Sequence, residues 1–373
     1  MIAGEASGDA LGAGLMRELT HRYGNNISFT GIGGPRMEAE GMKSLFPMHE
    51  LSYMGFAEIV PHMLRLTARI KDACEDAVNS DADIFITIDS PGFNFRVVEW
   101  LRRCYGDTIT CIHYVAPTVW AYKPHRAEKT AKLYDHLLTL LPFEPKYFKA
   151  YGLPSNFIGH PSVDNLYECF QTPREHHPQD NHLHVSLFPG SRRGEVKRML
   201  PIFIEALNLL HRHYDTLHVT IHSTDYIAPY LDVSALSASH SIITSDEDHH
   251  MALRRAHVAL SKTGTVTLDI TKYGVPMVAA YKVNKLTAYM VRKYLTIPYV
   301  NLINILNKKQ VIQECLQEKC TAEILATELK KLIMRPEIAR EQNRFCYAAL
   351  KKLYRPDEKK AHHNAADIIE TYL

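Results

Sequence analysis

The segment Asp83-Ile-Phe-Ile-Thr-Ile-Asp89, followed by Ser90-Pro-Gly-Phe-Asn94, decides the fold class. Its apolar run is short, rich in β-branched residues and ended by an acidic residue, which is typical of a strand buried on both faces. Helical sequence flanks this strand, at about Phe56–Val78 before it and at Phe93–Cys104 after it. A buried strand between two helices indicates a parallel sheet that is covered by helices on both faces.

The same alternation of strands and helices continues through the first half of the chain. We expect further strands at Ser28–Gly31, Thr108–Val115 and His136–Leu141, and further helices at Leu11–Tyr23 and His125–Leu133. Residues Gly4–Gly14 are expected to form the loop after a first strand, of which only Ile2-Ala3 remains. These elements predict a first domain over residues 1–171.

A second domain is predicted after a polar, proline-containing linker at residues 172–182. Its strands are expected at His184–Phe188, His218–His222, Ser241–Thr244, His257–Leu260 and Pro276–Tyr281. Its later helices are expected at about Lys308–Gln317, Ala322–Met334 and Ile338–Tyr354, with a last one at Lys359–Tyr372. The sequence therefore predicts two doubly wound α/β domains in tandem, the second over residues 183–356. Ligands of such sheets bind beyond the carboxyl ends of the strands.

The composition is that of an ordinary globular protein. The 373 residues include 43 Lys and Arg against 41 Asp and Glu, so no strong positive field indicates a nucleic acid as partner. The sequence has no run of 18 apolar residues, so we expect no membrane span, and its polar start is expected to carry no signal peptide. The seven scattered cysteines form no C-x-x-C pair and are expected to be reduced thiols in the cytoplasm.

Two turns rich in glycine and hydroxyl groups follow predicted strands of the second domain. The first contains Gly190, Ser191 and Arg192 and leads into a helix near Glu195; the second contains Thr263, Gly264 and Thr265, with Asp269 one turn into its helix. Amides at a helix N-terminus, a hydroxyl and a guanidinium suit a pyrophosphate, and a carboxylate suits ribose hydroxyls. The alternatives are ordinary helix capping and, for Asp269, complementation of the helix dipole. Two such turns in one domain favour a nucleotide diphosphate.

Asp89 ends the apolar strand of the first domain and is the candidate general base. Partial burial is expected to raise the pKa of its carboxyl group. The alternative is that Asp89 caps the helix that starts at Phe93. No metal site is expected, because Asp81-Ala-Asp83 opens a strand at the wrong edge of the sheet and the 21 histidines lack metal-ligand spacing.

An apolar and basic stretch precedes the deciding segment. It has more apolar residues than one core-facing stripe requires, and Arg65, Arg69 and Lys71 lie at its end. The apolar residues are Met54, Phe56, Ile59, Val60, Met63 and Leu64. Such a helix is suited to a membrane surface or to acyl chains, and the alternative is an ordinary packing helix. The stretch Lys282–Tyr294 has the same character.

Eight short motifs, in order from end to end, make the chain resemble the lipid-A-disaccharide synthase family. They are Ala3-Gly-Glu-Ala-Ser-Gly-Asp9, Gly33-Gly-Pro-Arg-Met-Glu-Ala-Glu-Gly41, Ile88-Asp-Ser-Pro-Gly-Phe-Asn94, His113-Tyr-Val-Ala-Pro-Thr-Val-Trp-Ala121, Leu141-Pro-Phe-Glu144, Phe157-Ile-Gly-His-Pro161, Pro189-Gly-Ser-Arg192 and Thr263-Gly-Thr265. The resemblance implies an inverting glycosyltransferase with two tandem Rossmann-like domains of the GT-B type and a cleft between them. It also implies that the C-terminal helix, residues 357–373, returns to the N-terminal domain.

The reaction that the resemblance implies moves 2,3-diacylglucosamine from its UDP derivative to 2,3-diacylglucosamine 1-phosphate, forming the β-1,6 disaccharide of lipid A and UDP. The resemblance implies that the enzyme needs no cofactor or metal and binds no nucleic acid. It implies peripheral contact with lipid at the cytoplasmic face of the inner membrane of a Gram-negative bacterium. A homodimer is compatible with the resemblance. Asp89 matches the base that takes the proton of the acceptor 6-hydroxyl. Arg192, with the amides near Ser191, matches the group that stabilises the leaving UDP. The remaining implied residues are Asn304 on the nucleotide side and Glu5, Ser7 and Asn94 in the acceptor domain.

Four features depart from the family pattern. The first strand is nearly missing, Asp269 replaces a glutamate, Gly92 replaces a second acidic residue, and Ile303 replaces a proline. Two alternatives stay open. One is another UDP-sugar enzyme of the same fold, either an epimerase or a transferase, because fold alone does not fix function. The other is a non-catalytic homologue that binds a membrane surface, which the nearly missing first strand makes conceivable. The apolar stretch favours a lipid substrate, because a soluble sugar would not need it.

Overall fold

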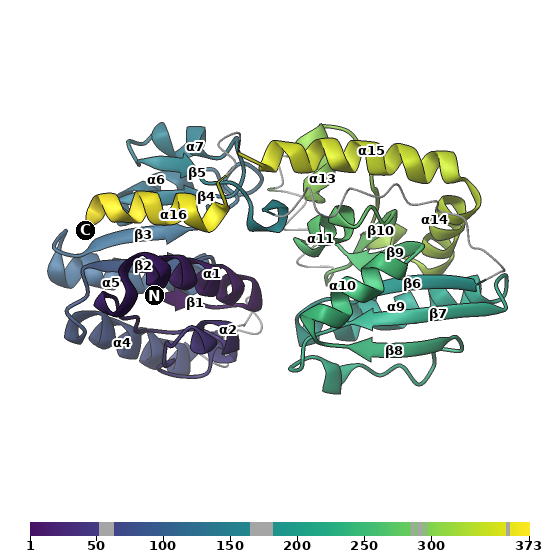
Figure 1. Ribbon diagram of the computed structural model, residues 1–373, viewed down its shortest axis with the longest axis horizontal. Helices are drawn as coiled ribbons and strands as arrows, with labels where there is room; N and C mark the ends of the chain where they lie inside the picture. Colours follow the sequence, from purple (N-terminus) through teal and green to yellow (C-terminus); the bar gives the residue numbers. More distant parts are fainter. Residues whose placement is uncertain (52–62, 165–181, 285–287, 289–293, 295–296, 356–358) are drawn as a thin grey trace. The chain divides into compact units, whose positions relative to one another are not determined.

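The computed structural model describes residues 1–51, 63–164, 182–284, 288, 294, 297–355 and 359–373. The chain forms two compact units, one made of Met1–Asp164 with Leu353–Leu373 and the other of Asn165–Lys352. Each unit contains one parallel sheet with helices on both faces (Figure 1). The predicted fold class, two doubly wound α/β domains, is confirmed.

The sheet of the first unit has the strand order β1-β2-β3-β4-β5. Its strands are β1 (Ile2–Ala3), β2 (Ile84–Ile88), β3 (Thr110–Tyr114), β4 (His136–Thr139) and β5 (Ser155–Phe157). The helices of this unit are α1 (Ala6–Tyr23), α2 (Pro35–Ala39), α4 (Met63–Asn79), α5 (Pro91–Tyr105), α6 (Arg126–Leu133), α7 (Pro145–Lys149) and α16 (Ala361–Ile369).

Side chains of its strands alternate between the two faces of the sheet, as the pleat requires. Ile86 joins a buried cluster with α1 and α16 on one face, and Phe85 joins the cluster on the face that α4 and α5 cover. The C-terminal helix α16 lies beside α1 (Figure 1). Arg22 of α1 forms ion pairs with Asp367 at 2.8 Å and with Glu370 at 3.0 Å. The end of the chain therefore completes one helical layer of this unit.

The sheet of the second unit has the strand order β11-β10-β9-β6-β7-β8. Its strands are β6 (His182–Phe188), β7 (Thr216–His222), β8 (Ser239–Ile243), β9 (Val258–Lys262), β10 (Met277–Tyr281) and β11 (Gln313–Leu316). The helices that follow them along the chain are α9 (Arg193–His211), α10 (Asp246–Arg255), α11 (Val266–Lys272), α13 (Leu302–Asn307), α14 (Ala322–Met334) and α15 (Pro336–Leu353).

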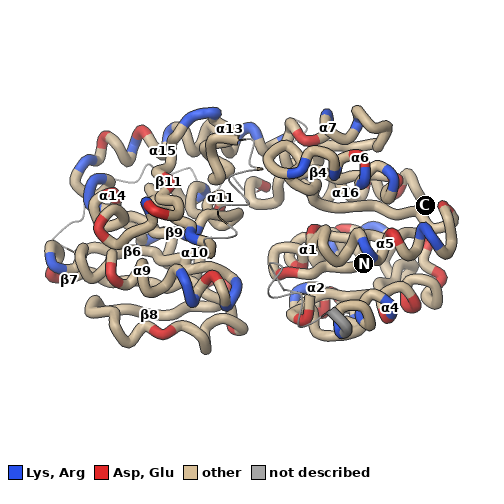
Figure 2. The backbone as a smooth tube through the Cα atoms, turned by 180° about the vertical axis from the view of Figure 1, so that it is seen from behind, with Lys and Arg blue, Asp and Glu red and all other residues tan. Residues whose placement is uncertain are grey.

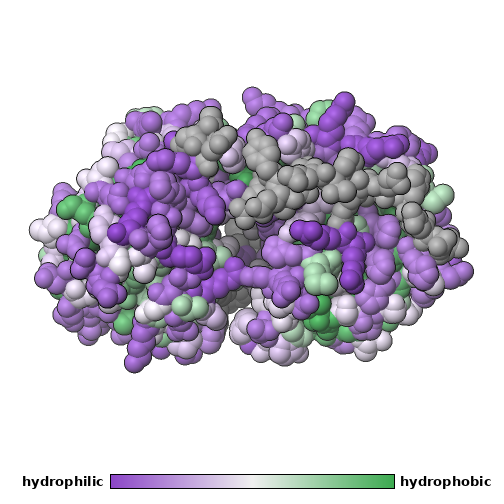
Figure 3. Space-filling model, viewed as in Figure 1, coloured by the Kyte–Doolittle hydropathy of each residue, from purple (hydrophilic) through white to green (hydrophobic). Residues whose placement is uncertain are grey.

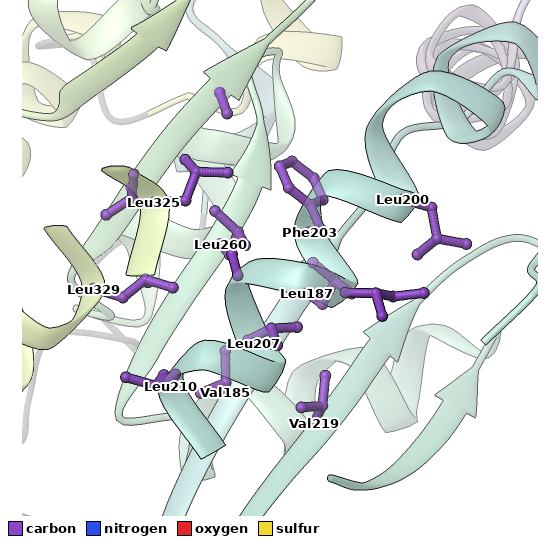
Figure 4. Close-up of a cluster of buried hydrophobic side chains, with 14 of the residues drawn as sticks. Val185, Leu187, Leu200, Phe203, Leu207, Leu210, Val219, Leu260, Leu325 and Leu329 are labelled. Atoms are coloured by element: carbon purple, nitrogen blue, oxygen red, sulfur yellow. The ribbon is translucent and has the colours of Figure 1, made fainter. Parts of the chain in front are cut away.

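A cluster of buried hydrophobic side chains packs α9 and α14 onto one face of this sheet (Figure 4). Leu187 of β6 and Leu260 of β9 belong to it together with Phe203 of α9 and Leu325 of α14. Full burial of one such side chain contributes about 1.5–3 kcal/mol to stability. The helix α10 contacts β6 from the opposite face, where β6 presents the polar side chains of His184 and Ser186.

Two expectations near the N-terminus are wrong. Residues Ser28–Gly31 form no strand; Ile32 alone bridges to Ile2, beside β1. Residues Gly4–Gly14 are not a loop, because α1 already begins at Ala6. The glycines of α1 serve close packing instead: a Cβ atom added to Gly12 would lie 2.5 Å from the sulfur of Met37.

The expected helix Lys308–Gln317 is also wrong. The helix α13 ends before it, since Lys308 adopts a left-handed conformation with φ of 52°. Residues Gln313–Leu316 then form β11, which pairs in parallel with β10. Ile312 and Cys315 are fully buried, so this short segment gains more from the edge of the sheet than from a helix.

Some sequence-based expectations fall outside the described residues. These include the linker at 172–182, apart from His182, and the apolar residues Met54, Phe56, Ile59 and Val60. Met63 and Leu64 begin α4, but their side chains are not among the described ones.

Charges of both signs are interspersed along the helices of both units (Figure 2). Hydrophilic residues cover most of the described surface that Figure 3 presents, and hydrophobic residues gather there in small groups. No helix in the described part of the chain is long and apolar enough to cross a membrane.

Candidate functional site

The strand order of the second unit reverses between β6 and β9. The strands β7 and β8 lie on one side of β6, and β9, β10 and β11 lie on the other. Doubly wound sheets bind ligands at such a reversal, beyond the carboxyl ends of the strands. The turns that leave β6 and β9 at this point are Gly190–Arg192 and Thr263–Thr265, the two turns for which the sequence predicts an anionic ligand. The sheet brings them side by side.

A buried carboxylate joins the ends of three neighbouring strands at this reversal. Glu195, in the first turn of α9, accepts hydrogen bonds at Oε1 from Lys262 Nζ at 3.0 Å and from Arg192 Nη1 at 3.3 Å. The hydroxyl of Tyr281, at the end of β10, donates to the same oxygen at 3.4 Å. Burial, followed by the nearby Glu195 carboxylate, raises the pKa of Tyr281 to about 12. The tyrosine therefore stays a neutral hydrogen-bond donor at neutral pH.

Sequence reasoning selected Arg192 and Glu195 but missed Lys262 and Tyr281. The only local signal for Lys262 is a basic residue at the end of an apolar strand, directly before Thr263-Gly264-Thr265. A lysine that is simply exposed to solvent at the end of a strand has the same sequence pattern, so the pattern does not identify a functional residue.

The first turn requires a glycine. Gly190 has a φ of 123°, and a Cβ atom there would lie 3.0 Å from Glu195 Oε2. The backbone therefore passes close to the buried carboxylate, while the side chain of Ser191 is exposed. In the second turn, the hydroxyl of Thr267 donates to the carbonyl of Gly264 at 2.7 Å and supports the start of α11.

Two other predicted donor-site residues differ in how their side chains are used. Asp269 lies in α11 and is half-buried. Asn304, in α13, is fully buried. The nitrogen of its side-chain amide donates to the carbonyl of Ile312 at 2.8 Å and to Glu314 Oε1 at 2.7 Å. The oxygen of the same amide accepts from the backbone N–H groups of Val311 and Ile312, both at 2.8 Å. These bonds engage the whole amide of Asn304 in holding the segment that enters β11.

In the first unit, the loops after β1 and β2 meet at one edge of the sheet. Ala3 pairs with Ile88, so Glu5 and Asp89 both follow the paired ends of neighbouring strands. The bridge from Ile32 lies on the other side of β1, and the direction of the chain across the sheet therefore reverses between β1 and β2. This is again the place where a doubly wound sheet holds a ligand.

Asp89 is held in a left-handed turn at this edge. Its φ is 51° and that of Ser90 is 44°. The buried amide of Asn94 donates to the carbonyl of Asp89 at 2.7 Å and to that of Ile88 at 3.3 Å. Asp89 is half-buried, and Ser90, rather than Asp89, occupies the N-cap position of α5. The turn therefore places Asp89 at the carboxyl end of β2, and the amide of Asn94 fixes the backbone there.

The loop after β1 fits closely against this turn. A Cβ atom on Gly4 would lie 2.8 Å from Cβ of Ser90. Glu5 occupies the N-cap position of α1, and Ser7 is exposed in its first turn. The structure thus brings Glu5 and Asp89 to the same edge, whereas Asn94 acts on the backbone of the turn.

The loops after β3 and β4 are joined by a buried glutamate that sequence reasoning noted only as part of a motif. Glu144 accepts hydrogen bonds from the indole N–H of Trp120 at 3.1 Å and from the backbone N–H of Leu141 at 3.0 Å. Burial raises the pKa of Glu144 to about 8. The hydrogen bonds that its two oxygens accept from Trp120 and Leu141 lower this pKa and only partly offset the effect of burial.

The described residues contain no group of three or more His, Cys, Asp or Glu placed to hold a metal ion.

The sequence matches one protein family over nearly its whole length. A family model described as lipid-A-disaccharide synthetase matches residues 1–369. The chain is 39% identical over 347 residues to the lipid-A-disaccharide synthase of Rhodospirillum centenum, with 92% of this chain and 86% of the relative covered. It is 38% identical over 375 residues to the lipid-A-disaccharide synthase of Gluconobacter oxydans, with 99% and 89% covered.

Solved structures of low sequence identity share the fold. The calicheamicin glycosyltransferase CalG4 matches with a TM-score of 0.59 at 15% identity, covering 100% of this chain and 96% of that chain. The UDP-GlcNAc 2-epimerase of Neisseria meningitidis, bound to UDP-GlcNAc, matches with a TM-score of 0.59 at 12% identity, covering 97% and 96%. These likenesses show a GT-B type of fold.

Proposed function

Because this chain belongs to the lipid-A-disaccharide synthase family, and is therefore a glycosyltransferase of lipid A biosynthesis, we propose that it transfers 2,3-diacylglucosamine from UDP-2,3-diacylglucosamine to 2,3-diacylglucosamine 1-phosphate. The products are the β-1,6-linked disaccharide 1-phosphate and UDP. The observation that carries this proposal is the family match over residues 1–369, which includes both strand-end sites.

Asp89 is the general base in this proposal. Its carboxylate takes the proton of the acceptor 6-hydroxyl while that oxygen bonds to the anomeric carbon of the donor. The bond from the anomeric carbon to UDP breaks at the opposite face, and its electron pair leaves with UDP, so the configuration inverts. Support comes from the position of Asp89 at the strand reversal, its partial exposure and its rigid left-handed turn.

The turns after β6 and β9 form the donor site in this proposal. The backbone of Gly190–Ser191 and the guanidinium of Arg192 bind the diphosphate, a charge-stabilising role in which one donor is worth roughly 3–4 kcal/mol. Thr263, Gly264 and Thr265 bind from the neighbouring strand end, and Asp269 binds the ribose. Asn304 is a positioning residue here, since its amide is engaged within the fold.

We also propose that the apolar residues 54–64 contact acyl chains at the membrane surface. The basic residues that follow them are held at a defined place, because Arg65 and Arg69 each form an ion pair of 2.8 Å with Glu50. Peripheral contact of this kind, at the cytoplasmic face of the inner membrane, would bring the enzyme to lipid substrates.

The test is a reaction with both lipid substrates, analysed by mass spectrometry. We expect equal amounts of UDP and disaccharide 1-phosphate, and no turnover when the acceptor is omitted. Conversion of the UDP-sugar without acceptor would support an epimerase instead. Binding of both substrates with no product would support a non-catalytic homologue.

A further inference from the structure

Lys262 lies at the strand reversal of the second unit, beside the turn assigned to the diphosphate. It is the last residue of β9 and pairs with Ala280 of β10. The residue before it, Ser261, pairs with Phe188, the last residue of β6. Lys262 therefore emerges next to the point where β6 turns into Gly190.

One buried carboxylate holds two cations there. Glu195 Oε1 lies 3.0 Å from Lys262 Nζ and 3.3 Å from Arg192 Nη1. The side chain of Glu195 is 6% exposed, whereas those of Lys262 and Arg192 are 18% and 21% exposed. The three groups carry two positive charges against one negative charge, and both cations remain within reach of a ligand.

Two further features of this corner suit an anion. The hydroxyl of Thr263 is buried and has no hydrogen-bond partner within the described structure, so it is available as a donor. A Cβ atom on Gly264 would lie 3.7 Å from Lys262 Nζ, so the glycine turn passes close to the ammonium group.

We propose that Lys262 is a second cation that contacts the diphosphate of the donor, and that Glu195 is the positioning residue that holds Lys262 and Arg192 before the donor binds. The ammonium group of Lys262 donates hydrogen bonds to phosphate oxygens. It stabilises the charge that UDP acquires when the bond to the anomeric carbon breaks, and no proton is transferred. This inference rests on the proposed function, since it requires a UDP-sugar at the turn after β6.

Binding of UDP and of uridine to the full chain tests this role, because uridine lacks the phosphates. Loss of one charged contact should weaken UDP binding by Lys262→Met about 10- to 100-fold and leave uridine binding unchanged. Lys262→Arg should recover part of the UDP affinity. The matched control is Lys197→Met, an exposed position of α9 that loses the same charge and should bind UDP as the wild type does.

The outcomes separate the two proposals. If the wild-type chain does not bind UDP, the proposed function fails and the inference fails with it. If the wild type binds UDP and Lys262→Met binds it equally well, only the inference fails. A parallel loss of UDP and uridine binding would show that Lys262 maintains the folded structure and does not act on the phosphates, and the inference would fail.

The role of Glu195 is tested by a double-mutant cycle. If Glu195 positions Lys262, then Lys262→Met should weaken UDP binding by a smaller factor in the Glu195→Gln background than in the wild type. Equal factors in both backgrounds would contradict the positioning role.

Discussion

At the scale of single residues, the turn at Asp89 determines which substitutions are informative. Asp89 and Ser90 both have positive φ angles, which residues other than glycine, asparagine and aspartate adopt at a cost of roughly 1–2 kcal/mol. An alanine at position 89 would therefore remove the carboxylate and also strain the turn. An asparagine keeps the shape of the side chain and tolerates the left-handed conformation.

We predict that Asp89→Asn lowers kcat about 10²- to 10⁴-fold, the usual contribution of a general base. Its melting temperature and its affinity for UDP should equal those of the wild type, whereas Asp89→Ala should also melt earlier. Steady-state kinetics, UDP titration and thermal unfolding measure these effects. An Asp89→Asn variant with full turnover would exclude the assignment of Asp89 as the base.

At the scale of secondary-structure elements, the start of the short helix α2 depends on one carboxylate of α1. Asp9 is buried and accepts hydrogen bonds from the backbone N–H groups of Gly34 at 2.8 Å, Arg36 at 3.0 Å and Met37 at 3.0 Å. These amides begin a helix and have no partner within it. Asp9 therefore caps a neighbouring helix, a structural role within a motif that the resemblance associates with the site.

Asp9→Ala should lower the free energy of unfolding by about 2–4 kcal/mol, because it leaves buried N–H groups without an acceptor. Urea unfolding measures this loss. Asp83→Ala, at an exposed position before β2, is the control and should change stability by less than about 0.5 kcal/mol. If both variants unfold at the same urea concentration as the wild type, Asp9 does not hold α2.

The elements that could be predicted are those with a strong local pattern. The strands β2, β3, β4, β9 and β10 are short apolar runs, β6 alternates polar and apolar residues, and each was expected within a few residues of its observed place. β11 was missed because its four residues have no such pattern and become a strand only by pairing with β10. The start of α1 was missed because its glycines resemble a loop, although they allow close contact with Met37.

The candidate sites show the same division. The position of the turn at Gly190–Arg192 could be predicted, since a strand pattern ends before it and a helix pattern follows it, and its role as an anion site stays a prediction. Lys262 and Tyr281 could not, because their partner Glu195 is 67 and 86 residues away and only the sheet brings the three together. Nothing local distinguishes such a lysine from a solvated one.

At the scale of the whole molecule, buried histidines in both units make stability depend on pH. Burial lowers the pKa of His113 to about 3, of His160 to about 4 and of His222 to about 2. The unfolded chain therefore binds more protons than the folded chain below the ordinary histidine pKa of 6.5, and stability falls as the pH falls. Glu144 acts in the opposite direction: its folded pKa of about 8 lies above the ordinary 4.5, so its contribution falls as the pH rises between these values.

We predict maximal stability near pH 7. Below pH 6.5, each of the three histidines lowers the free energy of unfolding by up to about 1.4 kcal/mol per pH unit, and together they outweigh Glu144. The melting temperature between pH 5 and pH 9 measures this profile. Burial also lowers the pKa of the Met1 amine to about 6, so its contribution to stability rises between pH 7 and pH 8 and offsets the fall from Glu144. Glu144→Gln should therefore make stability rise with pH over that interval, and a wild-type melting temperature that stays constant from pH 5 to pH 7 would contradict the prediction.

The central claim is that this chain forms the lipid A disaccharide by a single displacement at the anomeric carbon. Proton NMR of the purified product, formed by the full chain from UDP-2,3-diacylglucosamine and 2,3-diacylglucosamine 1-phosphate, tests the identity and the configuration of the new bond together. We predict a disaccharide 1-phosphate with one new β-1,6 linkage. An α linkage, or the absence of any disaccharide from a chain that binds UDP, would contradict the account.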